Sequence, residues 1–153
     1  MTKNKKVILS SIILVGVIGF FDSLYLTLKH YTQTSILCSI LEGCDRVTTS
    51  TYSIIGGVPV ALLGALYYLA IFILAIANIV KPDKKLAQIL FYLSLVGFLF
   101  SLWLVYLQIF VIKALCLYCL ISALTSTLIL ALSFIYLIKL KGDQSAASDA
   151  TDK

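Results

Sequence analysis

Four cysteines are the residues of this sequence best suited to do chemistry. Cys38 and Cys44 are separated by five residues, and Cys116 and Cys119 form a C-x-x-C motif far away along the chain. A thiolate attacks a disulfide through a mixed-disulfide intermediate, so two cysteine pairs that lie close together can pass electrons from one to the other. The pattern predicts thiol–disulfide chemistry, provided that the fold brings the two pairs together.

Membrane-spanning helices are the elements that must position these cysteines. Hydrophobic residues make up 61% of the chain and charged residues only 12%, whereas a soluble domain carries about 25% charged residues. Four apolar runs are each long enough to cross a bilayer, at about residues 7–28, 58–80, 86–112 and 114–138. We therefore expect an all-α membrane protein, a bundle of four transmembrane helices with an outer loop between the first and second helices. Residues 1–141 would form this membrane domain, and residues 142–153, rich in Ser, Ala and Asp, a disordered cytoplasmic tail.

Basic residues at the ends of the apolar runs predict an orientation in the cell membrane. One side holds Lys3, Lys5, Lys6, Lys81, Lys84, Lys85, Lys139 and Lys141. The other side holds only Lys29, Arg46 and Lys113. Under the positive-inside rule both termini are cytoplasmic and all four cysteines lie near the outer face, where disulfides form readily. Lysines at the helix ends set the orientation of the helices in the lipid bilayer, and this placement does not predict nucleic-acid binding.

The C-x-x-C motif lies in the first turns of the fourth predicted helix. A helix N-terminus and the nearby Lys113 would stabilise a thiolate, which is the reactive form of cysteine. Cysteine is also simply a good small apolar residue in a membrane helix, and four cysteines could bind zinc tetrahedrally. The second pair on the same side of the membrane favours redox chemistry over both alternatives.

A few other polar residues could serve a site at this level. Asp22 lies in the outward third of the first span, where it could contact a ligand or merely face the lipid headgroups. His30 could relay protons, although an interfacial histidine usually has no special role. Four aromatic residues could line a pocket or belong to interface belts, namely Tyr67, Tyr68, Trp103 and Tyr106.

The residues around the cysteines resemble the vitamin K epoxide reductase family, most closely its bacterial and archaeal members. The matching segments are Cys38, Cys44-Asp45-Arg46-Val47-Thr48-Thr49-Ser50, Gly57-Val58-Pro59, Leu63-Gly64 and Cys116-Leu117-Tyr118-Cys119. The resemblance covers about residues 10–138. DsbB, another four-helix thiol oxidase, has its C-x-x-C in the first outer loop, so the order of the pairs here favours the vitamin K epoxide reductase type.

The resemblance implies a four-helix bundle around a quinone, ubiquinone or menaquinone, and a role for each cysteine. It implies that Cys119 lies nearest the quinone, with Cys116 as its partner. Cys38 would exchange with Cys116, and Cys44 would meet an external redox protein. Ser50 falls six residues after Cys44 and matches the loop Ser or Thr that family members carry near the quinone-side site.

Two departures from the family pattern shape the functional hypothesis. Many bacterial members carry a fused thioredoxin-like domain that this sequence lacks, which implies a separate DsbA-like partner. Ala123 stands where the animal enzymes have a tyrosine, which implies a plain quinone as the acceptor. The leading hypothesis is a membrane enzyme, a thiol:quinone oxidoreductase that reoxidises a thioredoxin-like partner and supports disulfide-bond formation. The alternatives are a non-enzymatic membrane protein with structural disulfides or a metal-binding four-cysteine site, and a small transporter.

Overall fold

The computed structural model describes residues 3–32, 47 and 50–151. Its long helices are α1 (Lys3–Thr32), α3 (Val60–Val80), α4 (Lys84–Tyr106) and α5 (Leu117–Thr151). A π-helical segment, η2 (Leu107–Ile112), continues α4, and a short 3₁₀ turn, η1 (Thr51–Ser53), precedes the strands β1 (Ile54–Ile55) and β2 (Val58–Pro59). Four helices in this described part are long and apolar enough to cross a membrane. The predicted all-α four-helix bundle is therefore confirmed.

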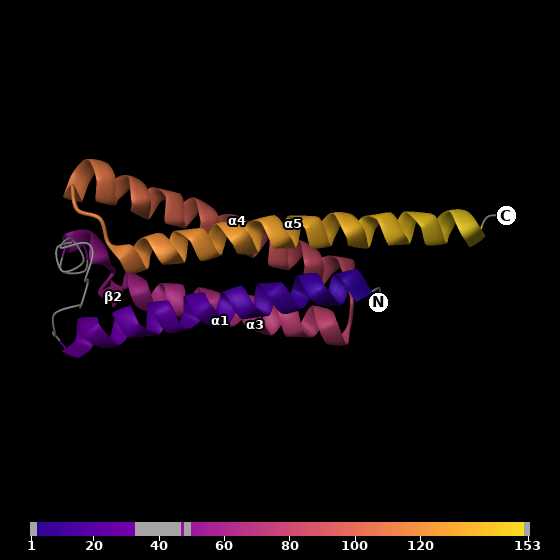
Figure 1. The fold of residues 1–153 in the computed structure, drawn as a ribbon, viewed down its shortest axis with the longest axis horizontal. Coiled ribbons are helices and arrows are strands. Elements are labelled where there is room, and N and C mark those ends of the chain that lie inside the picture. Colours follow the sequence, from indigo (N-terminus) through magenta and orange to yellow (C-terminus); the bar gives the residue numbers. More distant parts are fainter. Residues whose placement is uncertain (1–2, 33–46, 48–49, 152–153) are drawn as a thin grey trace.

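The helices lie side by side along one axis (Figure 1). Helix α1 packs against α3 and α5, and α4 packs mainly against α5. The N- and C-termini lie at one end of the bundle, whereas the β1–β2 hairpin and the connection from η2 to α5 lie at the other end. The start of α5, with its C-x-x-C motif, is therefore brought to the same end as the segment that follows the loop cysteines in sequence.

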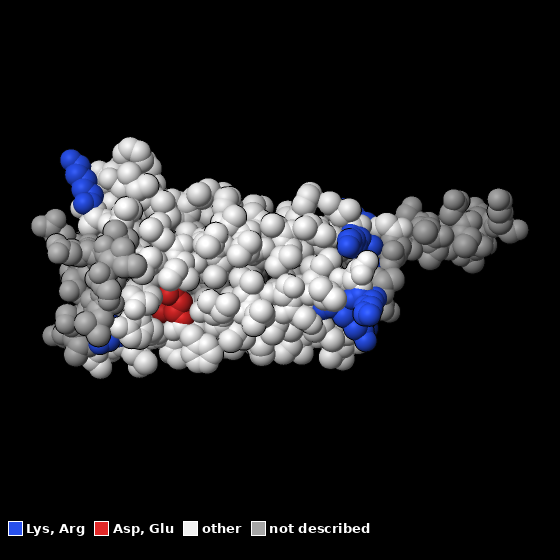
Figure 2. Space-filling model, viewed as in Figure 1, with Lys and Arg blue, Asp and Glu red and all other residues white. Residues whose placement is uncertain are grey.

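The surface of the bundle suits a lipid environment. Large apolar side chains such as Leu14, Val96 and Phe110 are more than 60% exposed, which water would strongly disfavour. Figure 2 shows Lys and Arg gathered toward the two ends of the molecule, and the surface between them on this face is uncharged except for one acidic patch. The chain is accordingly an integral membrane protein.

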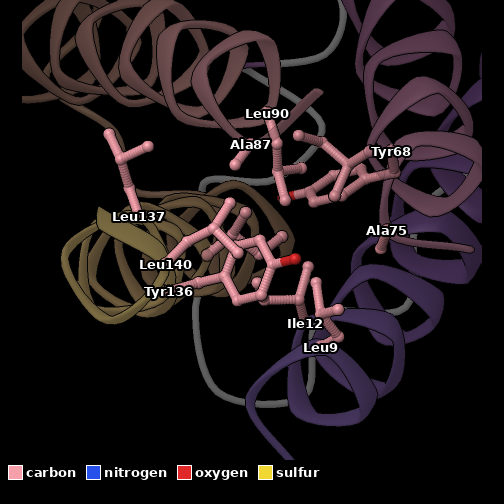
Figure 3. Close-up of a cluster of buried hydrophobic side chains, with 11 residues drawn as sticks. Leu9, Ile12, Tyr68, Ala75, Ala87, Leu90, Tyr136, Leu137 and Leu140 are labelled. Atoms are coloured by element: carbon pink, nitrogen blue, oxygen red, sulfur yellow. The ribbon is translucent and has the colours of Figure 1, made fainter. Parts of the chain in front are cut away.

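The core lies where the four helices meet, toward the end that holds the termini. Figure 3 shows Tyr68 from α3 and Tyr136 from α5 among aliphatic side chains of all four helices. Polar pairs join the helices within this apolar interior: Ser94 Oγ lies 2.7 Å from Ser133 Oγ, and the Tyr136 hydroxyl donates to Asn78 Oδ1 at 3.4 Å. Such bonds hold membrane helices together because lipid offers no competing partners.

The hairpin explains why α3 starts later than the apolar run does. Val58 and Pro59 pair with β1, and the two-residue turn between the strands consists of Gly56 and Gly57, with φ of 59° and 84°. Side chains rarely tolerate positive φ at two successive residues, so this turn depends on glycine. Pro59 then precedes the first residue of α3, where its missing N–H costs nothing.

Helix α5 also departs from the expected boundary. Its backbone continues to Thr151, through most of the segment 142–153 that the sequence predicts to be disordered. The alanines of this segment favour a helix, and no proline stops it. The helical backbone therefore extends beyond residue 141, whereas the disordered cytoplasmic tail at residues 142–153 and the domain boundary before it stay predictions.

Candidate functional site

The C-x-x-C motif forms the first turn of α5. Cys116 precedes the helix, and its carbonyl accepts the first helical bond, from the N–H of Leu120 at 3.1 Å. Cys119 lies one turn further along, and both residues are free thiols. Cys116 is fully buried, packed with Leu26 of α1 and Val47 of the loop. As whole residues the two cysteines therefore differ in exposure, although they are only three positions apart.

The surroundings of Cys116 stabilise its thiolate. The pKa of this thiol is lowered, first because the Cys119 thiol donates a hydrogen bond to the Cys116 sulfur, and further because the N–H groups of Cys119 and Tyr118 point at the same atom. Burial and the charge of Asp22 act in the opposite direction without reversing the shift. The expected effect of the helix start is thus present, whereas Lys113 is exposed at the surface and is not among the causes of the shift.

Gln108 holds the turn that carries the motif. Its side-chain Oε1 accepts the backbone N–H of Cys116 at 3.1 Å, and its own carbonyl accepts the N–H of Ala114 at 3.1 Å. The side chain is buried and lies in η2, a π-helical stretch that often marks functional sites. Gln108 was not among the candidate site residues considered from the sequence. Its position eight residues before Cys116, as a polar residue in an apolar run, was the available signal.

A cavity of about 530 Å³ opens beside the motif, within the bundle. Helices α1, α3, α4 and α5, η2 and the hairpin region all contribute to its wall, which is mostly apolar. Its size falls within the range of about 300–1,000 Å³ that is usual for small-molecule sites. Cys119 lines this cavity directly, so its sulfur borders a space suited to an apolar ligand.

The predicted site residues distribute unevenly around this cavity. Cys119, Ser50 and His30 line it. Cys116 lies behind Cys119, and Asp22 is not part of the wall, although its neighbour Ser23 is. The other two predicted catalytic residues, Cys38 and Cys44, lie outside the described residues.

A comparison with protein families decides the relationship. The family model described as "Vitamin K epoxide reductase family" matches residues 10–134. The chain belongs to this family. A search of curated protein sequences found no match. Membership confirms the resemblance inferred from the cysteine segments, and it makes the chain a membrane oxidoreductase.

Tyrosines and Phe100, and not the tryptophan, supply the aromatic wall of the cavity in this family member. Tyr67 and Tyr68 of α3 line it, whereas Trp103 and Tyr106 do not and are 44% and 56% exposed. The Tyr68 hydroxyl lies 2.6 Å from Thr125 Oγ1 and donates to the carbonyl of Ser122 at 2.9 Å. Of the four aromatic residues considered from the sequence, only this adjacent pair therefore belongs to the site.

Ser50 closes a loop turn at the cavity mouth. Its hydroxyl donates to the carbonyl of Val47 at 2.7 Å, and its own carbonyl accepts from the Ser53 hydroxyl at 2.7 Å. The side chain thus ties Ser50 to Val47, which packs against Cys116, and its hydroxyl proton is already engaged.

Asp22 is the buried acidic group nearest the motif. It is 9% exposed, and its Oδ2 has no hydrogen-bond partner among the residues described. Its charge acts on Cys116 and Cys119, so it lies close enough to influence the dithiol. Within residues 3–32, 47 and 50–151 no group of three or more His, Cys, Asp or Glu could hold a metal ion, and a four-cysteine site would need both loop cysteines.

Proposed function

We propose that this member of the vitamin K epoxide reductase family is a thiol:quinone oxidoreductase that reoxidises a separate thioredoxin-like, DsbA-like protein and so supports disulfide-bond formation. The proposal depends most on one observation: Cys119 lines an apolar cavity inside the bundle, while its partner Cys116 is buried against Val47, which follows Cys44 by three residues. The dithiol thus lies between an apolar space and Val47, a residue of the loop that carries the second cysteine pair.

The burial of Cys116 calls for a shuttle. A sulfur on a fully buried residue is closed to a folded protein in solution, so the proposal assigns the exchange with Cys116 to a cysteine of the loop between α1 and α3. Val47, which packs against Cys116, follows Cys44 by three residues. Three residues of extended chain span at most about 11 Å, so Cys44 is tethered to this end of the bundle.

The cavity fits a quinone in chemistry as well as in size. Its wall is mainly apolar and offers few polar groups, which suits a flat ring with two carbonyl oxygens and a lipid tail. The residues that would hold the ring are Leu63, Tyr67, Tyr68, Gly97, Phe100 and Cys119. When bound, a quinone supplies an acceptor for two electrons and two protons.

The cysteines of the chain would do the remaining chemistry by thiol exchange. A thiolate of the reduced partner attacks the Cys38–Cys44 disulfide, and the partner leaves oxidised. Cys38 then attacks Cys116 in the C-x-x-C disulfide, and the Cys119 thiolate departs. Cys44 attacks Cys38 in its turn, and Cys116 leaves as a thiolate. A low pKa speeds departure, so the lowered pKa of Cys116 favours this last exchange. Two electrons thereby reach the pair beside the cavity.

Trapping the shuttle tests this function. In Cys44→Ser the last exchange is impossible, so a Cys38–Cys116 disulfide should accumulate and appear in non-reducing peptide mapping. The matched control, Cys38→Ser, should show no such cross-link. A wild-type protein whose disulfides stay intact when a reduced DsbA-like protein is added would instead support purely structural disulfides.

A further inference from the structure

The Tyr67 hydroxyl is an unusual group in this cavity. Its oxygen is buried, and within the part of the chain that the structure describes it has no hydrogen-bond partner. The adjacent Tyr68 hydroxyl, in contrast, is bonded to both Ser122 and Thr125. Buried polar groups in native proteins nearly always have partners, and each exception needs an explanation. Because Tyr67 lines the cavity together with Cys119, a bound ligand is the natural source of the missing partner.

The Tyr67 ring is held where it is by its neighbours. It packs edge to face against Tyr68, with ring centroids 5.0 Å apart. On the other side it lies against Gly97 of α4, where a Cβ atom would stand only 2.6 Å from the hydroxyl oxygen. Only a glycine leaves room for the ring at this point. The hydroxyl therefore lies next to Gly97 between α3 and α4, and no acceptor among the described residues bonds to it.

We propose that the Tyr67 hydroxyl donates a hydrogen bond to a carbonyl oxygen of the quinone ring, an inference that rests on the proposed function. A phenol is the right donor for this task because it is neutral, so the apolar cavity need not solvate a charge. A donor aimed at a carbonyl oxygen also stabilises the negative charge that develops there during reduction. Tyr67 would thus fix the orientation of the ring relative to Cys119 and define the ligand as one that carries a carbonyl acceptor.

The test compares Tyr67→Phe with wild type in the full chain, reconstituted in lipid nanodiscs. This substitution removes one oxygen atom and leaves the ring that fills the space. Tyr92→Phe is the matched control, because Tyr92 is 61% exposed on α4 and does not line the cavity. The first readout is the dissociation constant for a short-chain menaquinone and a short-chain ubiquinone, measured by equilibrium dialysis. The second is the infrared carbonyl band of the bound, ¹³C-carbonyl-labelled quinone.

We expect Tyr67→Phe to weaken quinone binding about five- to twentyfold and to shift one carbonyl band to higher frequency, while Tyr92→Phe changes neither. The variant should be at least as thermally stable as wild type without quinone, because it loses an unpaired buried hydroxyl. If wild type binds quinone, and Tyr67→Phe binds it equally well with an unchanged carbonyl band, then water satisfies the hydroxyl, and this inference is wrong while the proposed function stands. If wild type binds no quinone, the proposed function itself fails.

Discussion

Replacing Gln108 with leucine should loosen the start of α5 and expose the C-x-x-C motif to exchange. The substitution keeps a side chain of similar length but removes the acceptor of the buried Cys116 N–H, now at 3.1 Å. Leaving one buried donor without a partner costs about 1–3 kcal/mol. If the first turn of α5 opens to recover that cost, its local opening equilibrium should rise about five- to 150-fold.

Amide hydrogen exchange followed by mass spectrometry measures this opening directly in the lipid-embedded chain. A peptide that spans residues 113–120 should exchange faster in Gln108→Leu by the factor given above, while peptides from the middle of α3 keep the wild-type rate. Asn78→Leu is the control: it removes another buried amide, which accepts from Tyr136 far from the motif, and should leave the 113–120 peptide unchanged. Equal protection of that peptide in Gln108→Leu and wild type would show that this bond does not hold the motif.

Three further perturbations test other parts of the reasoning. The first is Cys119→Ala, made in a chain whose two loop cysteines are replaced by serine, which removes the main hydrogen-bond donor to the Cys116 sulfur. The pKa of Cys116 should rise, so the thiolate absorbance near 240 nm should develop at higher pH. Cys119→Ser is the control because its hydroxyl keeps a donor at this position. In intact cells, an impermeant maleimide should not label Asp83→Cys, which lies between α3 and α4, but should label Cys38 and Cys44 after their disulfide is reduced. The reverse pattern would overturn the predicted orientation. Gly19→Ala would place a methyl group against the buried ring of Tyr68 with no room for it. It should lower the free energy of unfolding by about 1–3 kcal/mol, measured by thermal unfolding. Gly142→Ala is the control, because a methyl group there meets nothing within 4 Å, and it should be neutral or slightly stabilising.

The bundle could be predicted from the sequence because membranes impose a simple rule on it. A run such as residues 86–112 has no charged residue, and in lipid only a helix satisfies its backbone. Length, composition and lysine placement therefore predict four spans without knowledge of packing. The helix ends were less predictable. Both Val58, which joins a hairpin, and Thr151, the last residue of α5, depend on local backbone choices that hydropathy does not encode.

Only those site residues whose chemistry is evident from their residue type and spacing could be predicted from the sequence. Cys116 and Cys119 stand out by spacing, but nothing in the sequence distinguishes Tyr67 from Tyr68. Their difference arises from helix rotation: one hydroxyl meets Ser122 and Thr125 on α5, and the other faces α4, where Gly97 offers no acceptor. Gln108 likewise acquires its role from a π-helical turn, which changes the register of the side chains that follow it.

The two cysteines of the C-x-x-C motif differ in burial, and in the proposed function this difference sets the direction of electron transfer. In the proposed function, electrons pass from a water-soluble donor to an apolar acceptor, and a single exposed dithiol beside the cavity would let water and other thiols reach the acceptor site. Here Cys116 is sealed under Val47 and Leu26, and Cys119 opens onto the cavity. In the proposed shuttle, a loop cysteine approaches the buried Cys116, while Cys119 faces the apolar cavity. Substituting Val47 with alanine, which thins this cover, should therefore increase alkylation of Cys116 by a small external maleimide, and an unchanged labelling rate would mean that the cover does not control access.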